Sequence, residues 1–146
     1  MRASEIRSAI VAAVEGITPD KKASHRDVFR ELKTGYREMS QGQRTAHDRL
    51  FALRISTPPA RSKTVITTDL FTCDFDLSIF YSDAPGDLVE DRLAGDCERV
   101  AQRLESLSSE EGDLAKIEVM AGSIDEMDGV ISCNYVLSTT YRLTGV

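Results

Sequence analysis

Three aspartates are the residues of this sequence whose type and spacing best suit chemistry. Asp69, Asp74 and Asp76 lie close together in the chain, and carboxylate oxygens are the ligands that Ca²⁺ prefers. The same spacing is common on solvated strands, however, and the further ligands of a calcium loop are missing. The acidic stretch "DEMDG" at 125–129 resembles part of such a loop but has no bidentate Glu downstream. We therefore expect no metal site and interpret Asp74 and Asp76 as solvated carboxylates.

The histidines form no recognisable catalytic arrangement. Neither His25 nor His47 has a Ser or Cys neighbour in a pattern typical of a nucleophile and its base. The sequence also lacks the GxSxG, GxGxxG, Walker and HExxH motifs. We therefore expect no catalytic residue, no cofactor and no enzymatic activity. The alternative is an enzyme with an unrecognised site that uses Asp74, Asp76 and His47.

The cysteines do not indicate a metal site or a nucleophile. Cys73, Cys97 and Cys133 are an odd number and have no CxxC or Cys/His spacing. All three occupy apolar positions of the helix and strands predicted below. We therefore interpret them as small buried hydrophobic residues.

The elements that carry these residues begin with helical periodicity. Ile6, Ile10 and Val14 recur at helical spacing and predict a first helix. The stretch "SHRDVFREL" at 24–32 predicts a short second helix. The polar segment at 37–48 has no period, so we expect a loop there.

After residue 48 the hydrophobic period changes from 3.6 to two, which indicates strands. The segment "DRLFALRIS" at 48–56 predicts one strand, and "FTCDFDLSIFY" at 71–81 predicts a second, with an apolar residue at every odd position. A sheet with one buried face explains this alternation, because successive side chains point to opposite faces. Asp74 and Asp76 then lie on the polar face.

The second half of the chain predicts one long helix and two further strands. The helix is expected from Asp87 to Leu107, with an apolar seam at steps of four and three residues. The strands are expected at 116–122 and 130–146, separated by an acidic turn at 123–129. The order favours one α+β domain over residues 1–146: a mostly antiparallel sheet with the two main helices packed on one face.

The connection at 54–67, "RISTPPARSKTVIT", is long for a hairpin turn. Pro58 and Pro59 cannot donate ladder hydrogen bonds and hold the backbone extended. We therefore predict a stiff hairpin arm that presents Arg61 and Lys63 away from the body. Two interpretations stay open: a solvated hairpin tip, or an arm that contacts the acidic surface of a neighbouring subunit.

The charge is divided along the chain. Residues 1–63 carry 13 Lys and Arg against 7 Asp and Glu, a net charge of +6. Residues 64–146 carry 5 against 17, a net charge of −12, which gives the total of −6. Two differently solvated faces would explain the division. A basic surface that meets the acidic surface of another copy would explain it too.

Composition is typical of a globular chain, with 41% hydrophobic and 29% charged residues among 146. No apolar run is long enough for a transmembrane helix, so we expect no membrane association. The first residues, "MRASEIRSAIVAAVEG", are too polar for a signal peptide, and we expect a cytoplasm-like compartment.

The element order and several stretches resemble the tail-terminator proteins of long-tailed bacteriophages. The resemblance spans nearly the whole chain but contains no catalytic-type signature. It is carried by "SEIRSAIVAAVEGITPDKKASHRDVFREL", "DRLFALRI", "DFDLSIFYSDAPG" with "DRLAGDCERVAQRLESL", and "YVLSTTYRLTGV". The chain departs from a compact version of the family in the segments 34–48 and 54–67.

The resemblance implies a structural virion protein in the tail or neck, assembled in the host cytoplasm. Its copies would form a homo-hexameric ring that caps the tail tube, binds the tube protein and meets the head-completion or connector protein. DNA would pass through the ring without specific binding. The candidate interface residues are Pro58, Pro59, Arg61, Lys63, Asp74 and Asp76. The alternatives are another neck subunit, such as a head–tail joining protein, or a non-viral α+β module that binds a partner protein.

Overall fold

The computed structural model describes residues 1–19, 28–32, 48–62, 69–82, 89–120, 122–127 and 130–144. The described residues form a mostly antiparallel sheet with two main helices, which confirms the predicted α+β class. The elements follow in the order α1 (Ala3–Glu15), β1 (Arg30–Glu31), β2 (Leu50–Arg61), β3 (Leu70–Ser82), α2 (Val89–Glu105), α3 (Leu107–Glu110), β4 (Leu114–Met120), β5 (Ile124–Met127) and β6 (Val130–Arg142).

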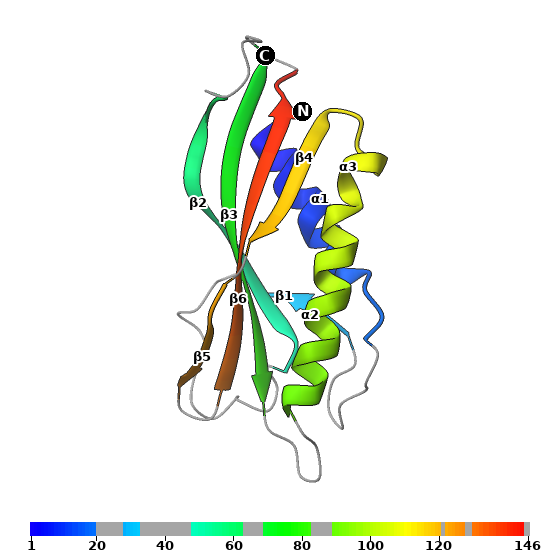
Figure 1. The fold of residues 1–146 in the computed structure, drawn as a ribbon, viewed down its shortest axis with the longest axis vertical. Coiled ribbons are helices and arrows are strands. Elements are labelled where there is room, and N and C mark those ends of the chain that lie inside the picture. The colour runs from blue at the N-terminus through cyan, green and yellow to red at the C-terminus, as the bar shows by residue number, and fades with distance from the viewer. Residues whose placement is uncertain are drawn as a thin grey trace.

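The sheet has the strand order β1-β2-β3-β6-β4, and β5 also pairs with β6. The long strands β2, β3 and β6 run almost the full length of the molecule (Figure 1). β1 is parallel to β2, whereas the other pairs are antiparallel. β3 and β6 are in unbroken register from Leu70 opposite Arg142 to Ser82 opposite Val130. The strands predicted around residues 71–81 and 130–142 therefore form the centre of the sheet.

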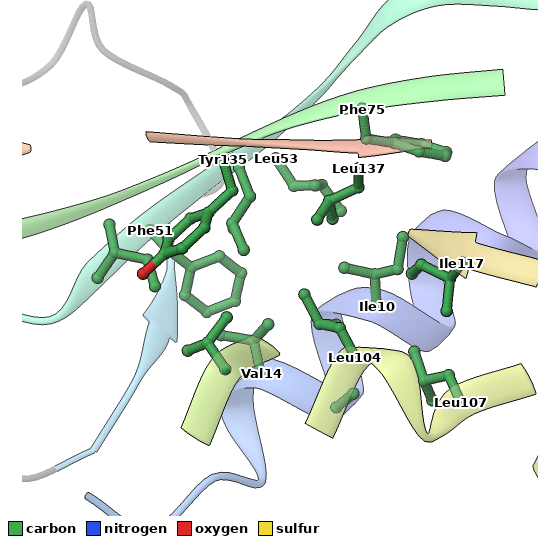
Figure 2. Close-up of a cluster of buried hydrophobic side chains, with 14 of the residues drawn as sticks. Ile10, Val14, Phe51, Leu53, Phe75, Leu104, Leu107, Ile117, Tyr135 and Leu137 are labelled. Carbon is green, nitrogen blue, oxygen red and sulfur yellow. The ribbon is translucent and has the colours of Figure 1, made fainter. Parts of the chain in front are cut away.

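One sheet face carries the core, as the alternation predicts. The odd positions of β3 from Cys73 to Tyr81 are buried, and so are most odd positions of β6. Figure 2 shows Phe75 and Leu137 of the sheet pointing toward Ile10 of α1 and Leu104 of α2. Since each buried aliphatic or aromatic side chain contributes about 1.5–3 kcal/mol, this cluster is the main stabilising element.

The helices cover the core face because each has one apolar stripe. In α1 the buried residues are Ile6, Ile10, Ala13 and Val14, which repeat at helical spacing. In α2 the buried apolar residues include Leu93, Val100 and Leu104. α1 and α2 also contact each other (Figure 1). No helix within the described ranges is long and apolar enough to cross a membrane.

The expected second helix at 24–32 is wrong in its described part. Arg30 and Glu31 form β1, and the Leu32 N–H donates to the Phe51 carbonyl at 2.7 Å. Two residues gain strand geometry here because β2 offers them an edge. Residues 20–27 and 33–47 lie outside the described part of the chain, and so does His47. At the end of the polar segment, Asp48 is fully buried instead of solvated.

The expected acidic turn at 123–129 is also wrong, because Ile124–Met127 forms β5 on the edge of β6. β2 and β3 are paired as the two strands of a hairpin, and residues 63–68 between them lie outside the described part of the chain. Up to Arg61, however, the first half of the predicted arm at 54–67 belongs to the sheet and does not project. β2 pairs with β3 as far as Arg61 opposite Phe71, and β3 is itself paired with β6 over that stretch.

Candidate functional site

The second half of β2 is an exposed edge of the sheet. All eight residues from Arg54 to Arg61 are exposed, although the first four residues of the strand are buried. β1 pairs with only the first two residues of β2. Ile55 shows the change most clearly: it lies opposite the fully buried Phe75, yet it is 49% exposed. We call Arg54–Arg61 the basic edge.

The two prolines lie where the pairing of β2 with β3 is irregular. Register shifts occur between Ile55 and Thr57 and between Thr57 and Ala60, so Pro58 and Pro59 fall within the second shift. Proline lacks the N–H that a ladder needs and is therefore confined to edges and bulges. The pairing thins at the prolines, as predicted, and then resumes. Arg61 lies over the ring of Phe71, with its guanidinium carbon 5.5 Å from the ring centroid.

The structure does not bring the three candidate aspartates together into one group. Asp74 and Asp76 are half-buried on the sheet face opposite the core. On β2, Thr57 lies opposite Asp74 and Arg54 lies opposite Asp76. Asp69 lies in the turn before β3, where its carboxylate is 3.1 Å from Arg142 Nε. Within the described ranges no three Asp, Glu, His or Cys side chains gather as a metal-binding group. Lys63 lies outside the described residues.

The opposite edge of the sheet is acidic. β4 and β5 both pair with β6 and occupy the side of the sheet away from β2. Glu118, Asp125 and Glu126 are exposed there, and Lys116 contributes one positive charge that lies 3.5 Å from Glu118. We call Leu114–Glu126 without residue 121 the acidic edge. The charged side chains within the two edges therefore differ in sign, with arginines on β2 and mostly carboxylates on β4 and β5.

Sequence reasoning missed a buried group of four charges. Asp48 and Arg49 directly precede β2, and each forms an ion pair with a residue of α2. Asp48 lies 2.7 Å from Arg92, and Arg49 lies 2.8 Å from Asp96. All four side chains are at most 1% exposed. Arg92 and Asp96 are four residues apart and therefore lie on one face of the helix. This spacing of two charged residues within an amphipathic helix is the one feature of the sequence that could have indicated the buried group.

The second feature missed is a cluster of two thiols and a phenol beneath a surface pocket. Cys97 of α2 and Cys133 of β6 have their Sγ atoms 3.4 Å apart. The Tyr135 hydroxyl donates a hydrogen bond of 2.8 Å to Cys97 Sγ. The pocket is open to solvent, has a volume of about 420 Å³ and lies between α2 and the acidic edge. Cys73 and Cys133 are buried as predicted, whereas Cys97 is only half-buried.

The cluster changes the acidity of its members. Hydrogen bonds from the Cys133 thiol and the Tyr135 hydroxyl outweigh the opposing effect of burial, and together they lower the pKa of Cys97 to about 7. The hydrogen bond to Cys97 and burial raise the pKa of Cys133. Burial raises the pKa of Tyr135, and its bonds to the two thiols add to this effect. The pair therefore releases its first proton near neutral pH and retains the second.

Comparison with models of known protein families finds no match, and comparison with curated protein sequences finds none that is significant.

Proposed function

We propose that this chain is a structural virion protein: a tail-terminator subunit whose copies form a ring that caps the tail tube of a long-tailed bacteriophage. The ring would join the tube to the head–neck connector. The observation that carries the proposal is the pair of unlike edges, the basic edge on β2 and the acidic edge on β4 and β5. A subunit with two different, complementary patches assembles head to tail, and such contacts produce closed rings when the rotation between copies allows it.

The charges of the two edges support a contact between unlike edges of neighbouring copies. The basic edge presents Arg54 and Arg61, and the acidic edge presents Glu118, Asp125 and Glu126. Opposite charges across an interface steer association and disfavour the wrong pairing of two like edges. Basic-to-basic and acidic-to-acidic dimers are therefore disfavoured, which leaves the head-to-tail arrangement that a ring needs.

The prolines determine what kind of contact the basic edge makes. Strand addition from a neighbour requires backbone N–H donors in sequence, and Pro58 and Pro59 interrupt that row. The contact is therefore made by side chains, with Ile55 as the apolar group and Arg54 and Arg61 as charged groups elsewhere along the edge. Burial of a side chain that is 49% exposed in the single chain would then contribute to assembly.

A ring subunit in this position needs no catalytic group, and we propose that the chain is not an enzyme. The half-buried Asp74 and Asp76 lie beside the basic edge, and they extend the proposed interface onto the outer face of the sheet. An acidic chain, with a net charge of −6, also suits a ring through which DNA must slide without binding, since phosphate contacts are what produce non-specific affinity.

The mass of the purified chain in solution tests the proposal. Light scattering, alone and with the tail tube protein, should give a closed oligomer of about six copies in at least one of the two conditions. Addition of this oligomer to growing tubes should stop their elongation, which electron microscopy can measure as tube length. A strict monomer under both conditions contradicts the proposal. A ring that binds a head connector but leaves tube growth unchanged would instead indicate another neck subunit.

A further inference from the structure

We propose that Cys97 and Cys133 form an oxidation site: a thiol pair that a hydroperoxide, entering through the adjoining pocket, converts into a disulfide between α2 and β6. This proposal does not depend on the proposed function, because it rests on the thiol cluster alone.

The positions of the two sulfur atoms favour a bond between them. They are 3.4 Å apart, whereas a disulfide requires about 2.05 Å, so a closing movement of about 1.4 Å is enough. The core holds the two elements near each other: Val100 and Leu104 of α2 and Leu137 of β6 are fully buried in the same cluster as Cys133. Because the two backbones are held in this way, the local concentration of one thiol near the other is high.

Exposure decides which thiol reacts first. Both cysteines line the open pocket, but Cys97 is half-buried whereas Cys133 is only 4% exposed. A small oxidant from solvent therefore meets Cys97 Sγ first. Cys73 is buried elsewhere, at 1% exposure, where its thiol donates to the Thr57 carbonyl at 3.4 Å. It provides a thiol in the same chain that should not react.

The groups around Cys97 make it the nucleophile. Two donors from β6 face its sulfur, the Cys133 thiol and the Tyr135 hydroxyl, and both stabilise the thiolate. Two carboxylates of α2, those of Asp96 and Glu98, oppose it. The donors prevail, and the pKa of Cys97 falls to about 7. A substantial fraction is therefore thiolate at neutral pH, and the thiolate is the form that attacks peroxides.

The reaction has two steps that balance. The Cys97 thiolate attacks one oxygen of the hydroperoxide and breaks the O–O bond, which gives a sulfenic acid on Cys97 and an alkoxide or hydroxide that takes a proton. Cys133 then loses its proton, and its sulfur attacks the sulfenic sulfur and expels hydroxide, which becomes water. The two thiols lose two electrons, and the hydroperoxide takes both. The product is one disulfide, one molecule of alcohol or water from the oxidant, and one further water.

The disulfide would close a loop that contains the end of α2, α3, β4 and β5. The acidic edge lies inside this loop, so oxidation would tie that edge to the helical layer. A closed loop of this size restricts the unfolded chain, and we expect the melting temperature to rise by about 5 °C or more.

The test uses the full chain, reduced and then treated with hydrogen peroxide at pH 7. Intact mass should fall by about 2 Da, non-reducing peptide mapping should link Cys97 to Cys133, and Cys73 should remain a thiol. The melting temperature should rise in the same sample and return after reduction. Oxidation of Cys97 to a sulfinic acid without a disulfide, or an intermolecular bond through Cys97, would overturn the proposal.

Variants separate the two steps. With Cys133→Ser the sulfenic acid on Cys97 should accumulate and be trapped by dimedone, whereas Cys73→Ser should leave disulfide formation unchanged. Tyr135→Phe removes one donor to the thiolate and should slow the first step by about fivefold or more at pH 7. An unchanged rate in Tyr135→Phe together with no trapped sulfenic acid in Cys133→Ser would contradict the assigned order of the two thiols.

Discussion

Arg49 and Asp96 form an ion pair that is completely enclosed by the protein. Arg49 Nε lies 2.8 Å from Asp96 Oδ2, a terminal guanidinium nitrogen lies 3.1 Å from Oδ1, and the Tyr81 hydroxyl donates to the same carboxylate at 2.9 Å. Arg49 also has its guanidinium carbon 5.8 Å from the centre of the Phe29 ring. Removal of one partner from such a pair leaves a buried charge without compensation. The pair therefore sets the position of α2 against the start of β2.

The first prediction concerns this pair. Asp96→Ala should lower the free energy of unfolding by about 3–5 kcal/mol, because the Arg49 guanidinium stays buried and loses its carboxylate. Urea denaturation of wild type and variant measures the change. Glu105→Ala, an exposed position on the same helix, should change it by less than about 0.5 kcal/mol. Equal losses in the two variants would show that the pair does not anchor α2. If Asp96→Ala does not fold, Asp96→Asn serves for the same comparison.

The second prediction concerns the backbone of Arg49, which has a φ of 60°. This left-handed conformation is strained for every residue except glycine. Arg49→Gly and Arg49→Ala lose the same ion pair, but only the glycine relieves the strain. We expect Arg49→Gly to be more stable than Arg49→Ala by about 1 kcal/mol in urea denaturation. An alanine variant as stable as the glycine variant would show that the left-handed conformation carries no cost at this position.

The third prediction concerns the junction between β4 and β5. A Cβ added to Gly122 would lie 1.4 Å from the carbonyl oxygen of Asn134, so the backbones would have to separate. Gly122→Ala should therefore lower the free energy of unfolding by more than about 2 kcal/mol. Gly112→Ala is the matched control, because nothing lies within 4 Å of its added Cβ. A melting temperature for Gly122→Ala close to that of Gly112→Ala would contradict the close approach.

The fourth prediction concerns the pH dependence of the Cys97 thiol. Because its pKa is lowered to about 7, the thiolate appears at lower pH than that of an ordinary cysteine. The rate of alkylation by iodoacetamide should be near its maximum at pH 8 and fall about tenfold per unit below pH 7. Tyr135→Phe should move the midpoint to higher pH, since it removes a hydrogen bond to the thiolate. Peptide mapping at each pH identifies the labelled cysteine, and an unchanged midpoint in the variant would contradict the role of Tyr135.

The fifth prediction concerns assembly through the two edges. Arg54→Glu with Arg61→Glu should raise the protein concentration needed for ring formation at least tenfold. Because Arg54 lies opposite Asp76 on β3, the new carboxylate should also lower the melting temperature of the single chain slightly. The pair Arg61→Glu and Lys63→Glu should weaken ring formation in the same way. The change Arg99→Glu, on the helical face, is the control with a charge reversal of the same sign.

A compensating variant makes this test specific. Glu118→Lys, Asp125→Lys and Glu126→Lys reverse the acidic edge, and alone they should also prevent assembly. In one chain with Arg54→Glu and Arg61→Glu they should restore it, because complementarity returns with the signs exchanged. Intact rings from the basic-edge reversal alone would show that these arginines are ordinary solvated residues.

The elements whose signal is local can be predicted from the amino-acid sequence. The unbroken alternation of residues 71–81 predicts β3 and its buried face, and the apolar seam of residues 93–104 predicts α2. In both cases each residue's environment follows from its neighbours within two to four positions. The α+β class follows from the order of these elements, since a sheet with one apolar face must be covered on that side.

Features that depend on partners far apart in the sequence follow from how the elements pack together. Arg30 and Glu31 become a strand because β2 lies beside them, although their local sequence favours a helix. Asp48 and Arg49 are polar residues in a polar segment, and they are buried because α2, more than 40 residues away, supplies opposite charges. Cys97 and Cys133 are 36 residues apart in the sequence, and they come into contact because α2 packs beside β6. The hydrophobic period of a segment indicates which face of its helix or strand a residue occupies. The packing of the elements determines which residues of other elements it contacts.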